Sequence, residues 1–455
     1  MRKIHLSFFL TCFISLQALA QQAYFFQKDD SILKKNYFDQ SLKKKASLLS
    51  SVDKKYAKDY KEIYETQFKE IGNLLQGTRA VTAPGAHGYL QSILQKIIAA
   101  NPELGGTDVR VIFSRDWWPN AYCMTDGTIA INAGLLIYLT NEAELAFVLC
   151  HELSHWWLDH MGKAIKKYVE TVNSNEFEQE LKRLSKEQYR VNEQLEKFAR
   201  KIVFDSRQHN RNNEAEADMQ AFNFMKKTGY DCDAIKTSLL LLDKIDDTLI
   251  FKRLEVKQVL NFNEYPFKKK WIEKESSIFS QLDENDGPLT KKEKDSLKTH
   301  PDCSKRISLL SDSLAKAPAG KKFLIDENAF NKLRKDFLFE ITEQCYRGDD
   351  LSRNLYYSLL LLQANENIPL ATYSVARCLN LIYEKQKDHK LGLAIETESK
   401  SYAADYNQLL RMLSRLRLEE IADLNYFFCR KYSEQLKNYP GFEIEMNKVR
   451  KLITN

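Results

Sequence analysis

Apolar side chains recur along most of this chain at helical intervals, and only two short stretches alternate as strands do. Residues 31–75 and 89–100 carry apolar positions three or four residues apart, which predicts helices. Residues 109–113 and 127–132 are rich in β-branched side chains that alternate with other residues, which predicts two strands. The strongly apolar residues 142–160 predict a helix that is buried on most sides. The expected fold is mainly α with a small β-sheet (α+β).

The rest of the chain is also helical in pattern and divides at one short loop. Residues 163–211 combine dense charge with regularly spaced apolar positions, which predicts a long amphipathic helix or hairpin. A stretch with proline and glycine after residue 315 is the best candidate boundary between domains. We expect one domain over 21–317, with its core at 89–310, and a helical domain over 318–455. The helical units match tetratricopeptide hairpins in length but lack a clean repeat of their signature residues, so we describe this domain as TPR-like and degenerate.

The first twenty residues are typical of a secretory signal peptide. Arg2 and Lys3 precede a largely apolar run, and the triplet Ala-Leu-Ala at residues 18–20 offers the small residues that signal peptidase requires. The apolar run is short for a membrane span, so an uncleaved anchor is the weaker alternative. We expect an exported protein, periplasmic or extracellular, with no transmembrane span once residues 1–20 are removed. Association with the membrane surface remains open.

Composition and charge narrow the function classes. The formal net charge is +6, but lysine and arginine are interspersed with acidic residues, so a nucleic-acid partner is not expected. Only 15 glycines and 9 prolines among 455 residues argue against a β-rich or disordered chain. The cysteines that follow the signal segment are odd in number and widely spaced, which excludes a disulfide framework and a CxxC zinc site. We expect most of them to be buried thiols, with one or two disulfides left open.

The helix predicted over 142–160 contains the sequence HELSH. His151 and His155 are one helical turn apart, so their imidazoles face the same point, and Glu152 lies next to that point. The alternative is an accidental match of the kind that surface helices produce. The flanking residues are apolar, however, and an unliganded histidine pair is costly to bury. The pattern therefore predicts a zinc site.

A catalytic zinc site needs a third protein ligand and one open position for water. Glu214 and Asp218 are one turn apart in the sequence NEAEAD, at the start of a further helical pattern. One of them could bind the metal while Asp218 accepts the free N–H of a ligating imidazole. An acidic first turn that complements the helix dipole is an equally good interpretation. The residues by themselves leave both open.

Taken together, these motifs resemble the zinc metallopeptidases of the HtpX and CAAX-prenyl-protease family. Four elements of this chain occur in the same order as in that family. They are PNAY before the strand GTIAIN, the helix NEAELAFVLCHELSH, ExxAD at residues 214–218, and THP followed by Arg-Ile at residues 306–307. The resemblance covers residues 109–310 and is closest to the soluble, exported BepA-like branch, which carries a helical repeat tail. It implies a gluzincin metallopeptidase domain followed by a helical domain.

The resemblance also implies roles for individual residues. His151, His155 and Glu214 would bind one Zn²⁺ per subunit, and Glu152 would be the general base that activates the attacking water. Asp218 would support a ligating histidine. These roles are those of a zinc metalloendopeptidase.

Further residues near the motif have implied roles. Asn120 and Ala121 would pair with an extended substrate by strand addition. His300 would lie near the metal, where it could stabilise the oxyanion or occupy the fourth metal position and hold the enzyme inactive. A plain helix cap before Pro301 is the structural alternative. We expect His160 to be structural.

The expected substrates are polypeptides, in particular unfolded or misassembled exported proteins. An alternative from another class is an envelope assembly factor or chaperone whose helical tail binds partner proteins and whose protease activity is latent. A third alternative is an inert fold that the metal merely stabilises. Cleavage preference and the partners of the tail are not predicted.

Overall fold

The computed structural model describes residues 26–186, 211–245, 253–273, 303–366, 368–400 and 402–453. The predicted signal peptide, residues 187–210 of the predicted amphipathic segment, and His300 lie outside these residues. No helix among the described residues has the length and apolar character of a membrane span. The architecture confirms a mainly α fold with one small sheet.

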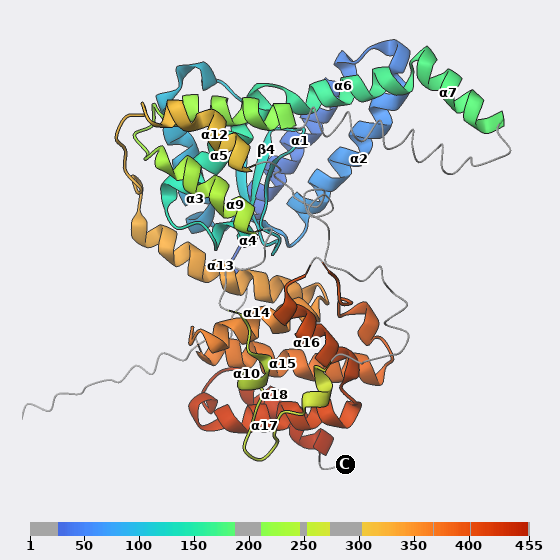
Figure 1. Ribbon diagram of the computed structural model, residues 1–455, viewed down its shortest axis with the longest axis vertical. Coiled ribbons are helices and arrows are strands. Elements are labelled where there is room, and N and C mark those ends of the chain that lie inside the picture. Colours follow the sequence, from blue (N-terminus) through green and yellow to red (C-terminus); the bar gives the residue numbers. More distant parts are fainter. Residues whose placement is uncertain are drawn as a thin grey trace, which may run out of the picture.

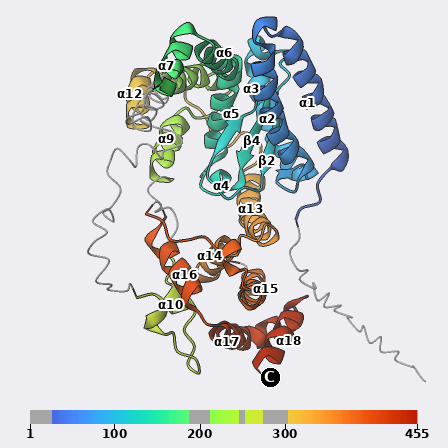
Figure 2. The same ribbon diagram turned by 90° about the vertical axis from the view of Figure 1, so that its right-hand side faces the viewer.

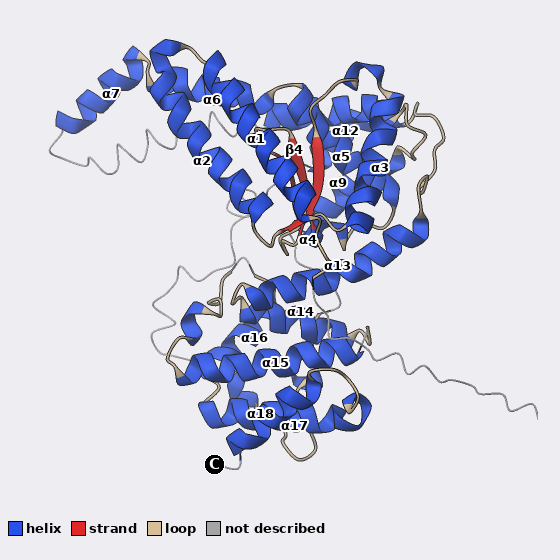
Figure 3. Ribbon diagram, turned by 180° about the vertical axis from the view of Figure 1, so that it is seen from behind, coloured by secondary structure: helices blue, strands red, loops and turns tan. Residues whose placement is uncertain are grey.

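A four-stranded mixed sheet lies at the centre of the upper lobe in Figure 3, with the strand order β1-β2-β4-β3. The strands are β1 (Ala80–Val81), β2 (Arg110–Ser114), β3 (Ala121–Cys123) and β4 (Thr128–Asn132). β2 and β4 are parallel and match the two predicted strands, whereas β1 and β3 pair antiparallel at the two edges. Every residue of β2 and β4 is buried, as expected for strands with helices on both faces.

Alternate residues of the central strands supply two hydrophobic clusters, one on each face of the sheet. Ile112 and Ala130 join a cluster with α1, α2 and α6, while Phe113 and Ile131 join the main core. Figure 2 shows α1 and α2 on one side of the strands and α5, α9 and α12 on the other. The helices of this lobe are α1 (Ser31–Ser51), α2 (Ala57–Gln76), α3 (Pro84–Ala100), α4 (Ala133–Leu136), α5 (Glu142–Trp157), α6 (His160–Val172), α7 (Asn175–Lys186), α9 (Asp233–Ile245) and α12 (Cys303–Leu314), with helical residues 211–225 and the short turns η1 (Lys54–Tyr56) and η2 (Pro102–Leu104).

The apolar helix predicted over 142–160 is interrupted, which corrects that prediction. α5 ends at Trp157, and Asp159 takes a left-handed backbone conformation with φ of 51°. This conformation is uncommon outside glycine because Cβ approaches the backbone. A Cβ on Gly162 would lie only 2.3 Å from Asp159 Oδ1, so a larger residue there would require the Asp159 side chain to move. α6 then starts at His160 in a new direction.

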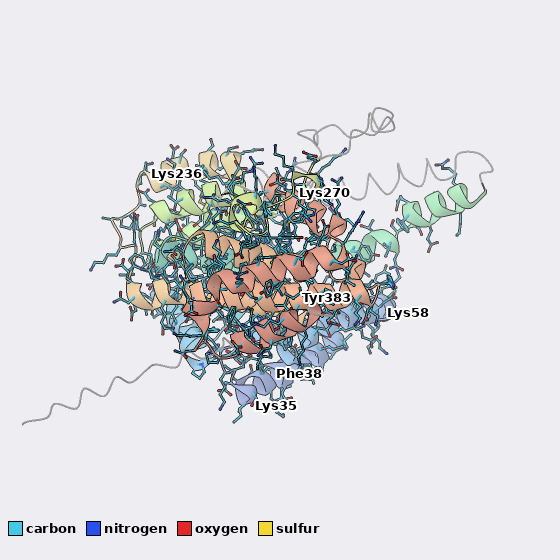
Figure 4. The ribbon with its side chains drawn as sticks, turned by 90° about the horizontal axis from the view of Figure 1, so that it is seen from below. Lys35, Phe38, Lys58, Lys236, Lys270 and Tyr383 are labelled. Carbon is cyan, nitrogen blue, oxygen red and sulfur yellow. The ribbon has the colours of Figure 1, made fainter. Side chains whose placement is uncertain are left out.

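The charged segment predicted to begin at residue 163 starts with two separate helices rather than one long helix. α6 lies against α2, where Asn173 Nδ2 donates a hydrogen bond of 2.8 Å to Asp59. α7 projects away from the body of the molecule (Figures 1 and 4). In Figure 4 Lys58, near the start of α2, lies at the margin from which α7 extends. The described part therefore breaks the predicted single helix at residues 173–174, and the hairpin alternative stays a prediction.

A second lobe lies below the sheet in Figure 1, and its described residues form helices and the turns that connect them. It contains α14 (Leu351–Gln363), α15 (Ile368–Lys387), α16 (Ala404–Arg415), α17 (Leu418–Leu436) and α18 (Phe442–Ile453), with the short turn η6 (Leu391–Leu393), and α13 (Glu327–Arg347) connects it to the sheet lobe. α15 packs against both α14 and α17, and α17 packs against α18. We call this region the helical lobe.

Residues 253–273 also pack on the helical lobe, although the chain returns to the sheet lobe after them. They include α10 (Val256–Val259) and η3 (Lys269–Trp271). The Leu254 amide donates to Asp405 Oδ2 at 2.7 Å, and Lys268 Nζ lies 2.9 Å from Glu420 Oε1. The chain thus passes between the lobes more than once, and the predicted boundary after residue 317 stays a prediction.

The seven cysteines of the described residues are all free thiols, and six of them are buried. Cys123 on β3 is half-buried. This confirms the expectation that most cysteines are buried thiols.

One buried arginine joins the N-terminal segment, the sheet and α13. The Arg115 side chain has no exposed surface, and its Nε donates to Glu340 on α13 while Nη1 lies 3.0 Å from Asp29 Oδ2. The Phe26 ring lies between the guanidinium groups of Arg115 and Arg347, at 4.2 and 4.3 Å from its centroid. These contacts hold the helical lobe to the sheet lobe.

Replacing Glu340 with glutamine should lower the free energy of unfolding by about 3 kcal/mol, because it leaves the Arg115 charge buried beside one acidic partner instead of two. Chemical denaturation measures this difference. Glu65→Gln removes one member of the exposed Lys61–Glu65 pair and should cost less than about 1 kcal/mol. Equal effects of the two substitutions would contradict the conclusion that Arg115 holds the two lobes together.

Candidate metal centre

Three side chains from two helices converge beside the sheet. His151 and His155 lie on α5, and Glu214 lies on the helical residues 211–225. His151 Nε2 and His155 Nε2 are 3.1 Å apart, and the Glu214 carboxylate oxygens lie 3.5 Å from the first and 3.4 Å from the second. The structure thus brings together the three residues that the motifs and the resemblance predict as metal ligands.

These separations fit a tetrahedral zinc ion. Ligand atoms about 2.1 Å from a tetrahedral zinc lie about 3.4 Å from one another. The three observed separations run from 3.1 to 3.5 Å. Two imidazole nitrogens and one carboxylate also form a donor set of catalytic zinc sites, in which the fourth position stays open. The residues present therefore fit Zn²⁺ in both chemistry and spacing.

Asp218 and Arg306 hold two of these ligands from behind. His151 Nδ1 lies 2.9 Å from Asp218 Oδ1, so its N–H donates to that carboxylate and Nε2 is the nitrogen that faces Glu214 and binds a metal once it has lost its proton. Arg306 on α12 donates to both oxygens of Asp218, at 2.6 and 2.7 Å, and its Nη1 lies 2.9 Å from Glu214 Oε2. The Arg306 guanidinium group therefore orients Glu214, which is a ligand, and also Asp218, which in turn orients the ligand His151.

The acidic groups around His151 favour a cation at its Nε2. Burial opposes ionisation of the imidazole, but hydrogen bonds to Asp218 and Glu214 outweigh it and raise the pKa of His151 to about 10. Burial likewise disfavours the Asp218 carboxylate, but Arg306 and His151 outweigh it and lower the pKa of Asp218. The site is thus built to hold positive charge next to the Asp218 carboxylate.

Glu152 is buried on α5 directly after the first ligand, and the edge strand β3 lies near it. Cys123 on β3 is half-buried as a residue, and the pKa of its thiol is raised, first because the surrounding protein desolvates the sulfur and second because the Glu152 carboxylate acts on it. Asn120 and Ala121 lie at the start of this strand, where the Asn120 carbonyl accepts from the Asn132 amide at 3.0 Å. Among the described strands β3 pairs with β4 alone, so it forms one edge of the sheet.

Two side chains next to the ligands were not predicted to have a role in the site. His160 Nδ1 lies 2.9 Å from His155 Nδ1, and His160 Nε2 lies 3.2 Å from Glu216 Oε2. In the sequence, His160 could be counted only as the last residue of one continuous helix, because the break at Asp159 leaves no mark in the apolar pattern. Arg306 entered the sequence analysis only as part of a motif, and its contacts become visible only in the fold.

His300 lies outside the described residues, so neither of the roles left open for it is tested.

A comparison with family models matches residues 84–314 to the model described as Peptidase family M48. The matched region is more than half of the chain and contains His151, Glu152, His155 and Glu214. A comparison with curated proteins found no match.

Zinc affinity should fall as the pH falls, with a sign that the pKa of His151 sets. That pKa of about 10 means that the metal-free imidazole carries an extra proton at neutral pH, and metal binding must release it. The zinc dissociation constant should therefore rise by about tenfold for each unit of pH lost between pH 8 and pH 6. Competition titrations with a chelating dye at several pH values measure it, and a dissociation constant independent of pH would contradict this reading of His151.

The substitution Asp218→Asn should raise the zinc dissociation constant by about 10- to 100-fold, because the neutral amide no longer balances Arg306 or strengthens His151 as a ligand. The same dye competition measures it. Asp312→Asn, on an exposed position of α12, is the matched control and should leave the affinity unchanged. Identical affinities in both variants would show that Asp218 does not support the metal site.

Proposed function

The chain belongs to peptidase family M48, whose members are zinc-dependent metallopeptidases, and on this premise we propose that it is an exported zinc endopeptidase that cleaves unfolded or misassembled proteins. The observation that supports this most directly is the convergence of His151, His155 and Glu214 at separations suited to one Zn²⁺. Glu152, beside the first ligand, supplies the acid–base group that peptide hydrolysis needs.

The catalytic roles follow from the positions of these side chains. A zinc ion held here would supply Lewis-acid activation of the attacking water and of the peptide carbonyl. Glu152 takes the proton from that water and passes it to the leaving amine. Asp218 and Arg306 keep His151 and Glu214 oriented, so the ligands need no rearrangement during the reaction.

The edge strand β3 suits an extended polypeptide substrate. A peptide that adds to a sheet edge is held mainly by main-chain hydrogen bonds, so many sequences can bind, provided that they are unfolded. Ala121 begins this strand and Asn120 directly precedes it, and β3 packs against α5, which carries Glu152. Trp118, just before the strand, is 40 % exposed and offers an apolar contact for a substrate side chain.

The remaining parts of the proposal rest on the sequence. The signal-like residues 1–20 and the resemblance to the BepA-like branch support a periplasmic location. The helical lobe would then bind envelope proteins, either to present substrates or to assist their assembly. This lobe is also the observation behind a second candidate function, an assembly factor whose protease activity is latent (Figure 1).

Glu152→Gln should lower the rate of cleavage of a fluorescently labelled unfolded casein by about 10³-fold, with zinc content unchanged, because the amide cannot accept the proton. Fluorescence release and metal analysis of the same samples test both parts. Glu170→Gln, an exposed position on α6, serves as the control and should retain full activity.

Full activity in Glu152→Gln would overturn the assigned base. If zinc-loaded wild-type protein cleaves no unfolded substrate while a strain carrying Glu152→Gln keeps its wild-type phenotype, the assembly-factor function is supported instead.

A further inference from the structure

The two histidine ligands are backed by different groups. Behind His151 lies a carboxylate, Asp218, at 2.9 Å. Behind His155 lies a second imidazole, since His160 Nδ1 is 2.9 Å from His155 Nδ1, and behind His160 lies the Glu216 carboxylate at 3.2 Å. We propose that His160 and Glu216 are positioning residues that set the tautomer and orientation of His155 for metal binding. This inference rests on the proposed zinc site and adds two residues to it.

The direction of each hydrogen bond follows from the number of protons available. The Glu216 carboxylate can only accept, so His160 Nε2 must carry a proton. A neutral His160 then has a bare Nδ1, which accepts from His155 Nδ1–H across the 2.9 Å contact. His155 Nε2 is left with a lone pair that faces Glu214 and His151. The opposite arrangement would place a proton on the nitrogen that must bind zinc.

The local backbone is arranged to bring His160 to this position. A straight continuation of α5 would place a residue five positions after His155 on a different side of the helix. The left-handed Asp159 ends α5, and α6 begins with the His160 ring next to His155, with ring centroids 4.9 Å apart. This backbone conformation has an energetic cost, and the chain accepts it at the residue that directs an imidazole to a ligand.

His160 and Glu216, the two residues proposed to support His155, differ in burial. The side chain of His160 is 7 % exposed, whereas that of Glu216 is 58 % exposed. The buried imidazole contact therefore ends at a carboxylate that lies mostly in solvent. Glu216 also lies between Glu214 and Asp218, so one helical segment supplies a ligand and the outer partners of both histidines.

The test compares zinc binding with stability in variants of His160. His160→Leu should raise the zinc dissociation constant by about 10- to 100-fold in dye competition. His160→Gln should recover most of the affinity, because its carbonyl accepts from His155 while its amide donates to Glu216. Thermal melting of each variant without and with zinc separates a role in metal binding from a role in packing. The rise in melting temperature that zinc produces should shrink in His160→Leu and return in His160→Gln.

His87→Leu is the matched control, since His87 is a half-buried histidine bonded to Tyr37 at 2.9 Å, away from the metal ligands. It should change the melting of the metal-free protein without changing zinc affinity. Wild-type affinity in His160→Leu would overturn the inference. So would equal loss of affinity in His160→Leu and His160→Gln, which would mark His160 as a packing residue. Failure of the wild-type protein to bind zinc would instead overturn the proposed function itself.

Discussion

The guanidinium group of Arg306 between Asp218 and Glu214 is the interaction on which the site depends. Two carboxylates and two imidazoles in a largely buried space are unstable unless their charges are balanced, and removing one member of such a set costs several kcal/mol. Arg306 balances both carboxylates at 2.6–2.9 Å. Because it comes from α12, the fold must bring α5, the helical residues 211–225 and α12 together before the site exists at all.

The rest of the sheet lobe holds α5 in place for this purpose. Its buried face packs against the sheet, and its first residue, Glu142, accepts hydrogen bonds of 2.6 Å from both Tyr89 and Tyr230 and further ones from the amides of residues 324–326. Those amides lead into α13, so the connection to the helical lobe is attached to the start of the helix that carries the ligands. Arg115 adds a second attachment through Glu340. The helical lobe is therefore tied to the sheet lobe at two points, at Glu142 before α13 and at Glu340 within it.

Each ligand has its own support, and the supports differ in reach. His151 and Glu214 share Arg306, which is buried, whereas His155 depends on His160 and then on the exposed Glu216. Metal affinity is therefore set by contacts between segments far apart in the chain as much as by the ligands themselves. Proteins that share only the two histidines and Glu152 need not share that affinity.

The sequence by itself determined the features that follow from local periodicity and spacing: the central strands β2 and β4, the apolar helix α5 with His151 and His155 one turn apart, and the pairing of Glu214 with Asp218 on one helical face. Spacing left open which of the two acidic residues binds the metal, and the tertiary structure places Glu214 beside both Nε2 atoms and Asp218 behind His151. Tertiary structure alone also decided where α5 ends and that Arg306, His160 and Glu216 lie beside the ligands. The physical reason is that a helical period reports only which residues share a face. A backbone break at Asp159 and ion pairs between distant segments depend on long-range packing, which leaves no periodic mark along the chain.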